Sequence, residues 1–327
     1  MDLLTPKDLV DERGFQFRYY CCSPAHSSLP TVIFLHGFPS DWNDWRFPVQ
    51  HLKPLGYGLV VPDLLGAGKT SRPLDSKAYK KNPMAADIVQ ILDAEKLDKV
   101  VGVAHDWGCS LLSRLSMLYP ERFIAFGWVS PSFLPPVVVK FDLDAVMATM
   151  KKLLGYECFS YWQFFAREDA ADVIEKNVDS FIQLLYPRDP DSWRTYLALP
   201  GKTAEWMDGN MTPGFPDWLQ PQDIEAIRRN VLDSGGIRSS LGWYLCQIES
   251  NDLDDNKKIP HEAWKIQRPS LFIAAKRDWI CAEKLGKITM AEYGADVTTV
   301  EMDTGHWPHL ECPEQFNREL TSWLLRL

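Results

Sequence analysis

The sequence predicts an α/β protein with a mostly parallel, doubly wound sheet and an inserted all-helical segment. Short apolar runs, typical of strands covered on both faces, alternate with segments of helical spacing. The alternation stops between about Pro135 and Tyr244 and then resumes. A helical segment inserted between two strands of one sheet explains this gap most simply.

Seven candidate strands follow one another along the chain, at residues 15–20, 31–35, 58–61, 100–104, 123–129, 270–275 and 297–302. The first alternates loosely and is expected to be an edge strand, whereas those from 31–35 to 270–275 are apolar runs. Helical spacing is clearest at 87–97 and 109–118. These patterns predict a core of residues 1–135 and 246–327 and a helical cap of residues 136–245. The cap would lie over the carboxyl ends of the strands, where open α/β sheets bind ligands.

Composition excludes several classes of partner. The formal net charge of −9 argues against nucleic acid or an anionic membrane surface, since both favour a basic face. No apolar stretch approaches the roughly 20 residues that a membrane span needs, and no signal peptide is predicted. The seven cysteines form no CxxC pair, which predicts reduced thiols and a cytoplasmic location. The oligomeric state cannot be predicted from these features.

The segment Ala104-His105-Asp106-Trp107-Gly108 links a predicted strand to a predicted helix. Small residues two positions before and after Asp106 fit a sharp turn, the nucleophile elbow, which lifts the central side chain above the sheet. Asp106 could instead only cap the helix. As a carboxylate with a pKa near ~4, it is ionised at neutral pH and can attack a saturated carbon to form an alkyl ester. We therefore expect Asp106 to be a nucleophile.

An alkyl ester must then be cleaved by water, which needs a base. His306 follows the last candidate strand, where the chain order nucleophile, acid, histidine places that base. Asp278 follows the strand at 270–275, whereas the strand at 123–129 is followed by no carboxylate. We expect Asp278 to orient the His306 ring, although it could be an ordinary loop residue.

The loop His36-Gly37-Phe38-Pro39 follows the strand at 31–35. In combination with the elbow, it predicts an oxyanion hole in which the backbone N–H groups of Phe38 and Trp107 donate to the Asp106 carboxyl group. Gly37 and Pro39 would shape the loop. A tight turn without a chemical role is the structural alternative.

Two other patterns resemble binding motifs without completing them. His306, His309 and Cys312 have spacing compatible with zinc, but a proline interrupts them and no fourth ligand is evident. The segment 63–70 nearly matches a phosphate-binding loop, yet it begins with Asp63 in place of the required glycine. No metal and no cofactor are predicted.

Together the motifs resemble the α/β-hydrolase superfamily and, within it, the epoxide hydrolases. The likeness runs from His36 to nearly the end of the chain and also includes Trp45-Arg46, Pro62-Asp63, Gly305-His306 and the segment 311–314. The resemblance implies an α/β-hydrolase fold and the conversion of a small apolar epoxide and water into a vicinal diol. Ala104 stands where this family often has glycine, which removes no reacting group.

The epoxide hydrolases carry two cap tyrosines that hydrogen-bond the epoxide oxygen, and the resemblance places these roles on Tyr161 and Tyr244. Tyr161 begins an aromatic segment and Tyr244 ends the segment Gly-Trp-Tyr. A neutral phenol, with a pKa near ~10, is a donor at neutral pH. Such a preorganised donor supplies about 3 kcal/mol to the alkoxide that ring opening produces. Core packing is the alternative reading of both residues.

Three alternatives to an epoxide hydrolase remain open. A haloalkane or haloacid dehalogenase also uses an aspartate elbow, but a haloalkane dehalogenase commonly has asparagine where Phe38 stands, and a fluoroacetate dehalogenase has arginines beginning at the position of Trp107. A small-ligand receptor could retain the scaffold without catalysis. A serine esterase is disfavoured because Ser110 lies one helical turn past the elbow.

Overall fold

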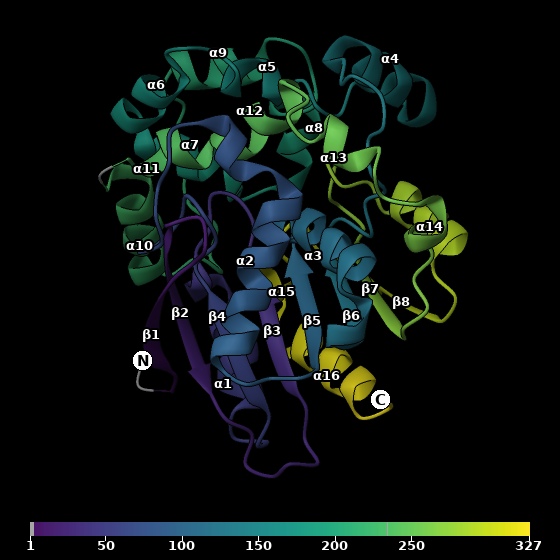
Figure 1. The fold of residues 1–327 in the computed structure, drawn as a ribbon. Helices are drawn as coiled ribbons and strands as arrows, with labels where there is room; N and C mark the ends of the chain where they lie inside the picture. The colour runs from purple at the N-terminus through teal and green to yellow at the C-terminus, as the bar shows by residue number, and fades with distance from the viewer. Residues whose placement is uncertain (1–2, 234) are drawn as a thin grey trace.

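The computed structural model describes residues 3–233 and 235–327, and its central element is an eight-stranded sheet (Figure 1). The strands are β1 (Thr5–Val10), β2 (Gln16–Cys22), β3 (Thr31–Leu35), β4 (Gly58–Pro62), β5 (Val100–His105), β6 (Phe123–Val129), β7 (Ser270–Ala275) and β8 (Val297–Met302). Their order in the sheet is β1-β2-β4-β3-β5-β6-β7-β8. All neighbours from β4 to β8 pair in parallel, whereas β1 and β2 are antiparallel. The predicted fold class is confirmed.

The amino-terminal hairpin differs from the prediction in two ways. β1 was not expected, because most of its side chains are exposed and it lacks an apolar pattern. β2 was expected at the sheet edge, but it pairs with β1 on one side and with β4 on the other. Its alternating exposed and buried residues therefore reflect one covered face in the interior of the sheet.

Helices cover both faces of the sheet (Figure 1). One face is covered by α1 (Arg46–Leu52) and α16 (Pro313–Leu324), whose apolar residues form a buried cluster with β3 and β4. The other face is covered by α2 (Lys81–Ala94) and α3 (Trp107–Leu118), with α14 (Glu283–Tyr293) beside β7. α2 begins six residues earlier than the predicted helix at 87–97, because Asp252 accepts the Lys81 backbone N–H at 2.7 Å and fixes this end of the helix.

The segment between β6 and β7 contains helices and, in its described residues, no strand. These helices are α4 (Leu143–Leu154), α5 (Tyr161–Phe165), α6 (Ala170–Lys176), α7 (Val178–Leu185), α8 (Trp193–Tyr196), α9 (Lys202–Asp208), α10 (Pro221–Leu232), α11 (Gly236–Ser240), α12 (Gly242–Ile248) and α13 (Leu253–Asn256). Most of them gather at one end of the molecule, toward which β5 points (Figure 1). The boundaries 135/136 and 245/246 between core and cap stay a prediction.

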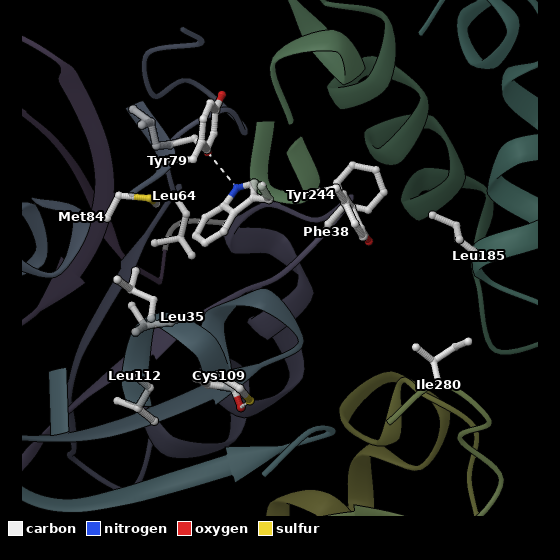
Figure 2. Packing of buried hydrophobic residues seen from close by; sticks show 14 of the residues in the cluster. Leu35, Phe38, Leu64, Tyr79, Met84, Cys109, Leu112, Leu185, Tyr244 and Ile280 are labelled. Carbon is white, nitrogen blue, oxygen red and sulfur yellow. Dashed lines mark hydrogen bonds between the residues drawn. The ribbon is translucent and has the colours of Figure 1, made fainter. Parts of the chain in front are cut away.

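The apolar core continues from the sheet into these helices. Figure 2 shows Leu35 of β3 and Leu112 of α3 in the same cluster as Phe38. Tyr244 and Leu185, which belong to the inserted helices α12 and α7, are in this cluster too. A contiguous cluster of this kind gives the insertion a fixed position over the sheet.

The order of the strands also indicates where a ligand is expected to bind. β3 lies between β4 and β5, so the connections leaving β3 and β5 run to opposite sides. In open α/β sheets, ligands bind outside the carboxyl ends of the strands at such a switch point. The loop after β3 contains residues 36–39, and the turn after β5 contains Asp106.

Two further predictions concern location. Among the described residues, no helix combines the length and apolarity needed to cross a bilayer. All seven cysteines are free thiols, as predicted. The cytoplasmic location stays a prediction.

Candidate active site

The turn after β5 holds Asp106 in a strained conformation. Its φ of 51° and ψ of −125° lie where a non-glycine residue costs roughly 1–3 kcal/mol. The turn is tight because a Cβ at Gly108 would overlap the carbonyl oxygens of Leu35 and His36, and a Cβ at Gly37 would overlap the Asp106 carboxyl group. Asp106 precedes α3 but makes no side-chain capping hydrogen bond. The helix-capping alternative is therefore wrong.

The two carboxylate oxygens of Asp106 have different surroundings. The backbone N–H of Phe38 donates to Oδ1 at 2.8 Å, and His306 Nε2 lies 3.5 Å from Oδ2. The side chain is 16% exposed. Burial alone would raise the pKa of Asp106, but the interaction with His306 outweighs it and holds the pKa below its usual value. Asp106 is therefore ionised, with one oxygen held by a donor.

Asp278 holds the other side of the His306 ring. His306 Nδ1 donates to Asp278 Oδ2 at 2.6 Å, and both side chains are buried. Asp278 Oδ1 accepts the backbone N–H groups of Ile280 and Cys281, each at 2.9 Å. Burial lowers the pKa of His306, but the charges of Asp278 and Asp106 prevail and raise it to about 10. The structure thus brings together the three residues expected to act as nucleophile, base and acid.

The loop that carries His306 is fixed by residues for which no role was predicted. His105 Nε2 donates to the backbone oxygen of His306 at 2.8 Å. Glu311 accepts the N–H groups of Gly305 at 2.7 Å and Trp307 at 3.1 Å. The sequence contained one signal for Glu311, a carboxylate shortly after the histidine, whereas nothing in it linked His105 to a residue 201 positions away.

The predicted oxyanion loop is present, with one of its two expected contacts. The Phe38 N–H reaches Asp106, whereas the hydrogen bonds of the described residues include none from the Trp107 N–H to that carboxylate. His36 is buried, donates through Nδ1 to the Gly37 oxygen, and accepts the Leu64 N–H at Nε2, both at 2.8 Å. Burial lowers its pKa to about 4, so a neutral imidazole ties the loop to the segment after β4. The Phe38–Pro39 peptide bond is cis.

The two cap tyrosines lie together above the elbow. Tyr161 begins α5 and Tyr244 is on α12, with ring centroids 5.9 Å apart. The Tyr244 ring meets the Phe38 ring at 5.0 Å and the Trp107 ring at 5.1 Å, both edge to face. Figure 2 shows Tyr244 beside Phe38. Burial raises the pKa of both phenols well above 10, and the negative charge of Asp106 raises both further. Both are therefore neutral donors near an anionic Asp106.

A cavity of about 360 Å³ adjoins these residues. Asp106, Trp107, Tyr161, Ile280 and Cys281 are among the residues that line it. Its volume lies in the range of about 300–1,000 Å³ typical of small-molecule sites. His306 and Tyr244 are not among the lining residues, but each borders residues that are: His306 Nε2 lies 3.5 Å from Asp106 Oδ2, and the Tyr244 ring contacts the rings of Tyr161 and Trp107.

Possible metal ligands gather at one place in the described part of the chain. Asp278, Cys281 and His306 offer ligand atoms within 4.8 Å of one another. Asp278 and His306 already share a short hydrogen bond, and Asp278 also accepts two backbone N–H groups, which is the arrangement of an oriented base. His309, from the zinc pattern weighed above, is buried and stacks on Trp45 at 4.7 Å.

Comparison with known proteins identifies the family of this chain. Residues 32–319 match the alpha/beta hydrolase family. Epoxide hydrolase A of Mycobacterium tuberculosis is 28% identical over 98% of this chain and 97% of its own length. Bifunctional epoxide hydrolase 2 of Sus scrofa is 25% identical over 90% of this chain, which spans about half (51%) of that protein. The crystal structure of epoxide hydrolase A from Mycobacterium thermoresistibile superposes with a TM-score of 0.80, at 25% identity and 98% coverage of both chains. The chain therefore belongs to the alpha/beta hydrolase family, as the motifs predicted.

Proposed function

We propose that this chain is an epoxide hydrolase that forms an alkyl ester on Asp106 and releases a vicinal diol. One observation carries the proposal: Asp106 Oδ1 is held by the Phe38 N–H while Oδ2 faces His306, beneath two neutral phenols. The relatives named epoxide hydrolases support the same reaction. The substrates are an epoxide and water.

The first step is attack of Asp106 Oδ2 on an epoxide carbon. We assign this oxygen because Oδ1 already accepts the Phe38 N–H and becomes the ester carbonyl oxygen. The ring C–O bond breaks, its electron pair moves to the ring oxygen, and that oxygen takes a proton from Tyr161 or Tyr244. A preorganised donor is worth about 3 kcal/mol at such a developing charge.

Ester formation also prepares His306 for the second step. The Asp106 charge helps keep His306 protonated in the free protein. Once Asp106 is an ester, that charge is gone and the pKa of His306 falls. The proton of His306 then restores the phenol, which leaves a neutral imidazole beside the ester.

Water completes the reaction. His306 Nε2 takes a proton from a water molecule as it attacks the ester carbonyl carbon, and Asp278 stabilises the imidazolium. The oxyanion forms on Oδ1, where the Phe38 N–H already donates. Collapse breaks the bond between the carbonyl carbon and Oδ2, which receives the proton from His306 and leaves as a hydroxyl group of the diol, while the water oxygen stays in the Asp106 carboxyl group.

No observation favours a dehalogenase over this reaction. Phe38 supplies only a backbone donor, and two buried phenols suit an alkoxide, which needs a proton, better than a halide, which does not. The dehalogenase and the non-catalytic receptor are therefore outcomes of the test below.

The test is turnover of aryl, terpenoid and fatty-acid epoxides, with chiral analysis of the diols and halide release measured in parallel on haloalkanes and haloacids. Diol formation by the wild-type protein, lost in Asp106→Asn, supports the proposal. Halide release without diol formation would assign a dehalogenase. Tight binding of epoxides without any turnover would assign a receptor.

A further inference from the structure

A buried arginine lines the cavity without a full set of partners. Arg114 is 5% exposed, and its Nε and Nη1 atoms are buried without a hydrogen-bond partner among the described residues. A guanidinium stays charged inside proteins, so leaving its donors unpaired is costly. Trp107, Ser110 and Arg114 lie on one face of α3 and all line the cavity. The cavity therefore runs along α3 from the proposed nucleophile to this guanidinium.

A second buried cation lies in the same wall. Lys81 is 1% exposed, and its Nζ lies 3.2 Å from Asp252 Oδ2, although the geometry is not that of a hydrogen bond. The same Nζ lies 5.2 Å from the centre of the Trp107 ring. Asp252, which is also buried, lines the cavity with Lys81 and Arg114.

The charges at this end of the cavity do not cancel. Lys81 and Arg114 face one lining carboxylate, Asp252. Asp255, the other carboxylate that acts on Arg114, already pairs with Lys80 at 2.5 Å. The remaining lining carboxylate, Asp106, interacts with His306 at the other end. One positive charge is therefore left over in a buried polar wall with free donors, which is the chemistry of an anion-binding site.

The distance to Asp106 defines what kind of anion fits. Eight residues of helix separate Asp106 from Arg114, which is about 12 Å at 1.5 Å per residue. The Arg114 side chain leans toward the helix amino terminus, which shortens this span. The cavity is also lined by apolar side chains such as Phe159, Trp162 and Leu285. A substrate with an epoxide at one end, an apolar chain and an anionic group at the other end would match Asp106, the apolar lining residues and Arg114, respectively.

We propose that Arg114 and Lys81 bind the carboxylate of the substrate, so that the preferred substrates are epoxides carrying a carboxylate at the far end of an apolar chain. This inference names the substrate class for the proposed function and rests on it.

The first test compares ω-epoxy carboxylic acids of increasing chain length with their methyl esters. The wild-type protein should hydrolyse the best acid with a kcat/KM about tenfold or more above that of its ester, the usual effect of a hydrogen bond to a charged group. Arg114→Met should remove this preference by raising KM for the acid while leaving the ester unchanged within about twofold. Arg318→Met, on the exposed face of α16, is the matched control and should change neither value. Equal rates for acid and ester, or equal losses of both in Arg114→Met, would overturn the inference.

Two further measurements separate this inference from other causes. Calorimetric binding of decanoate, compared with decanol, needs no turnover; it should be seen with the wild-type protein and be weakened about tenfold in Arg114→Met. Decanoate binding without hydrolysis of any epoxide would leave the anion site standing and reject the proposed function. Equal binding of decanoate to both proteins would reject the site. If Arg114→Met does not fold, Arg114→Lys should keep the acid preference, and the wild-type comparison of acid and ester still decides the question.

Discussion

Replacing Asp106 with asparagine is expected to lower the pKa of His306 by about 3.5. His306 Nε2 lies 3.5 Å from Asp106 Oδ2, and burial alone would push the pKa of His306 below its usual value. Unit charges at this separation interact by about 5 kcal/mol at an effective dielectric constant of about 20, which corresponds to roughly 3.5 pKa units. From its value of about 10 in the wild-type protein, the pKa should fall to near neutrality.

The assay is an NMR titration of histidine-labelled protein, with the His306 signal assigned from its loss in His306→Gln. Asp217→Asn is the matched control, because the Asp217 side chain is 94% exposed, and it should leave the titration of His306 unchanged. The Asp106→Asn variant mimics the charge of the esterified protein. A pKa of His306 that falls by less than about 1 in this variant would refute the reasoning that ester formation frees this base.

Three other changes test separate parts of the site. Gly37→Ala should lower the rate by at least about 100-fold without unfolding the protein, because the added Cβ overlaps the Asp106 carboxyl group and displaces it from the Phe38 N–H. Steady-state kinetics measure the rate, and circular dichroism measures whether the protein stays folded. Tyr161→Phe and Tyr244→Phe should each lower kcat by about 100-fold, and the double variant should be slower than either; similar rates for all three would contradict two donors. Protonated His306, whose pKa is raised from 6.5 to about 10, should stabilise the fold fully below pH 6.5, and this contribution should be lost as the pH rises through 10. Urea denaturation of wild type and His306→Gln across this range measures the difference, and a difference independent of pH would contradict it.

The parts of the fold that could be predicted are those fixed by local pattern. β3, β6, β7 and β8 have the predicted bounds, because each is a distinct run between turn residues. The elbow could be recognised because Gly108 must be small where the chain passes the β3 carbonyl groups. β1 could not be recognised, since it is held by backbone pairing to β2 and buries few side chains.

Asp106, Asp278 and His306 could be predicted from the sequence, because each is a reactive residue type in a loop that directly follows a predicted strand. The residues that fix this geometry could not, because they act through contacts between distant segments. His105 supports the His306 loop across 201 positions, and the Lys81 backbone meets Asp252 across 171. Neither hydrophobic periodicity nor a short motif indicates a contact between residues so far apart in the sequence.

The most direct test of the central claim is mass spectrometry of His306→Gln after incubation with an epoxide that the wild-type protein hydrolyses. The account predicts a mass increase equal to that of the epoxide, located on the peptide that contains Asp106 and absent when Asp106→Asn is added. Normal turnover by His306→Gln with no adduct, or an adduct on another residue, would contradict it.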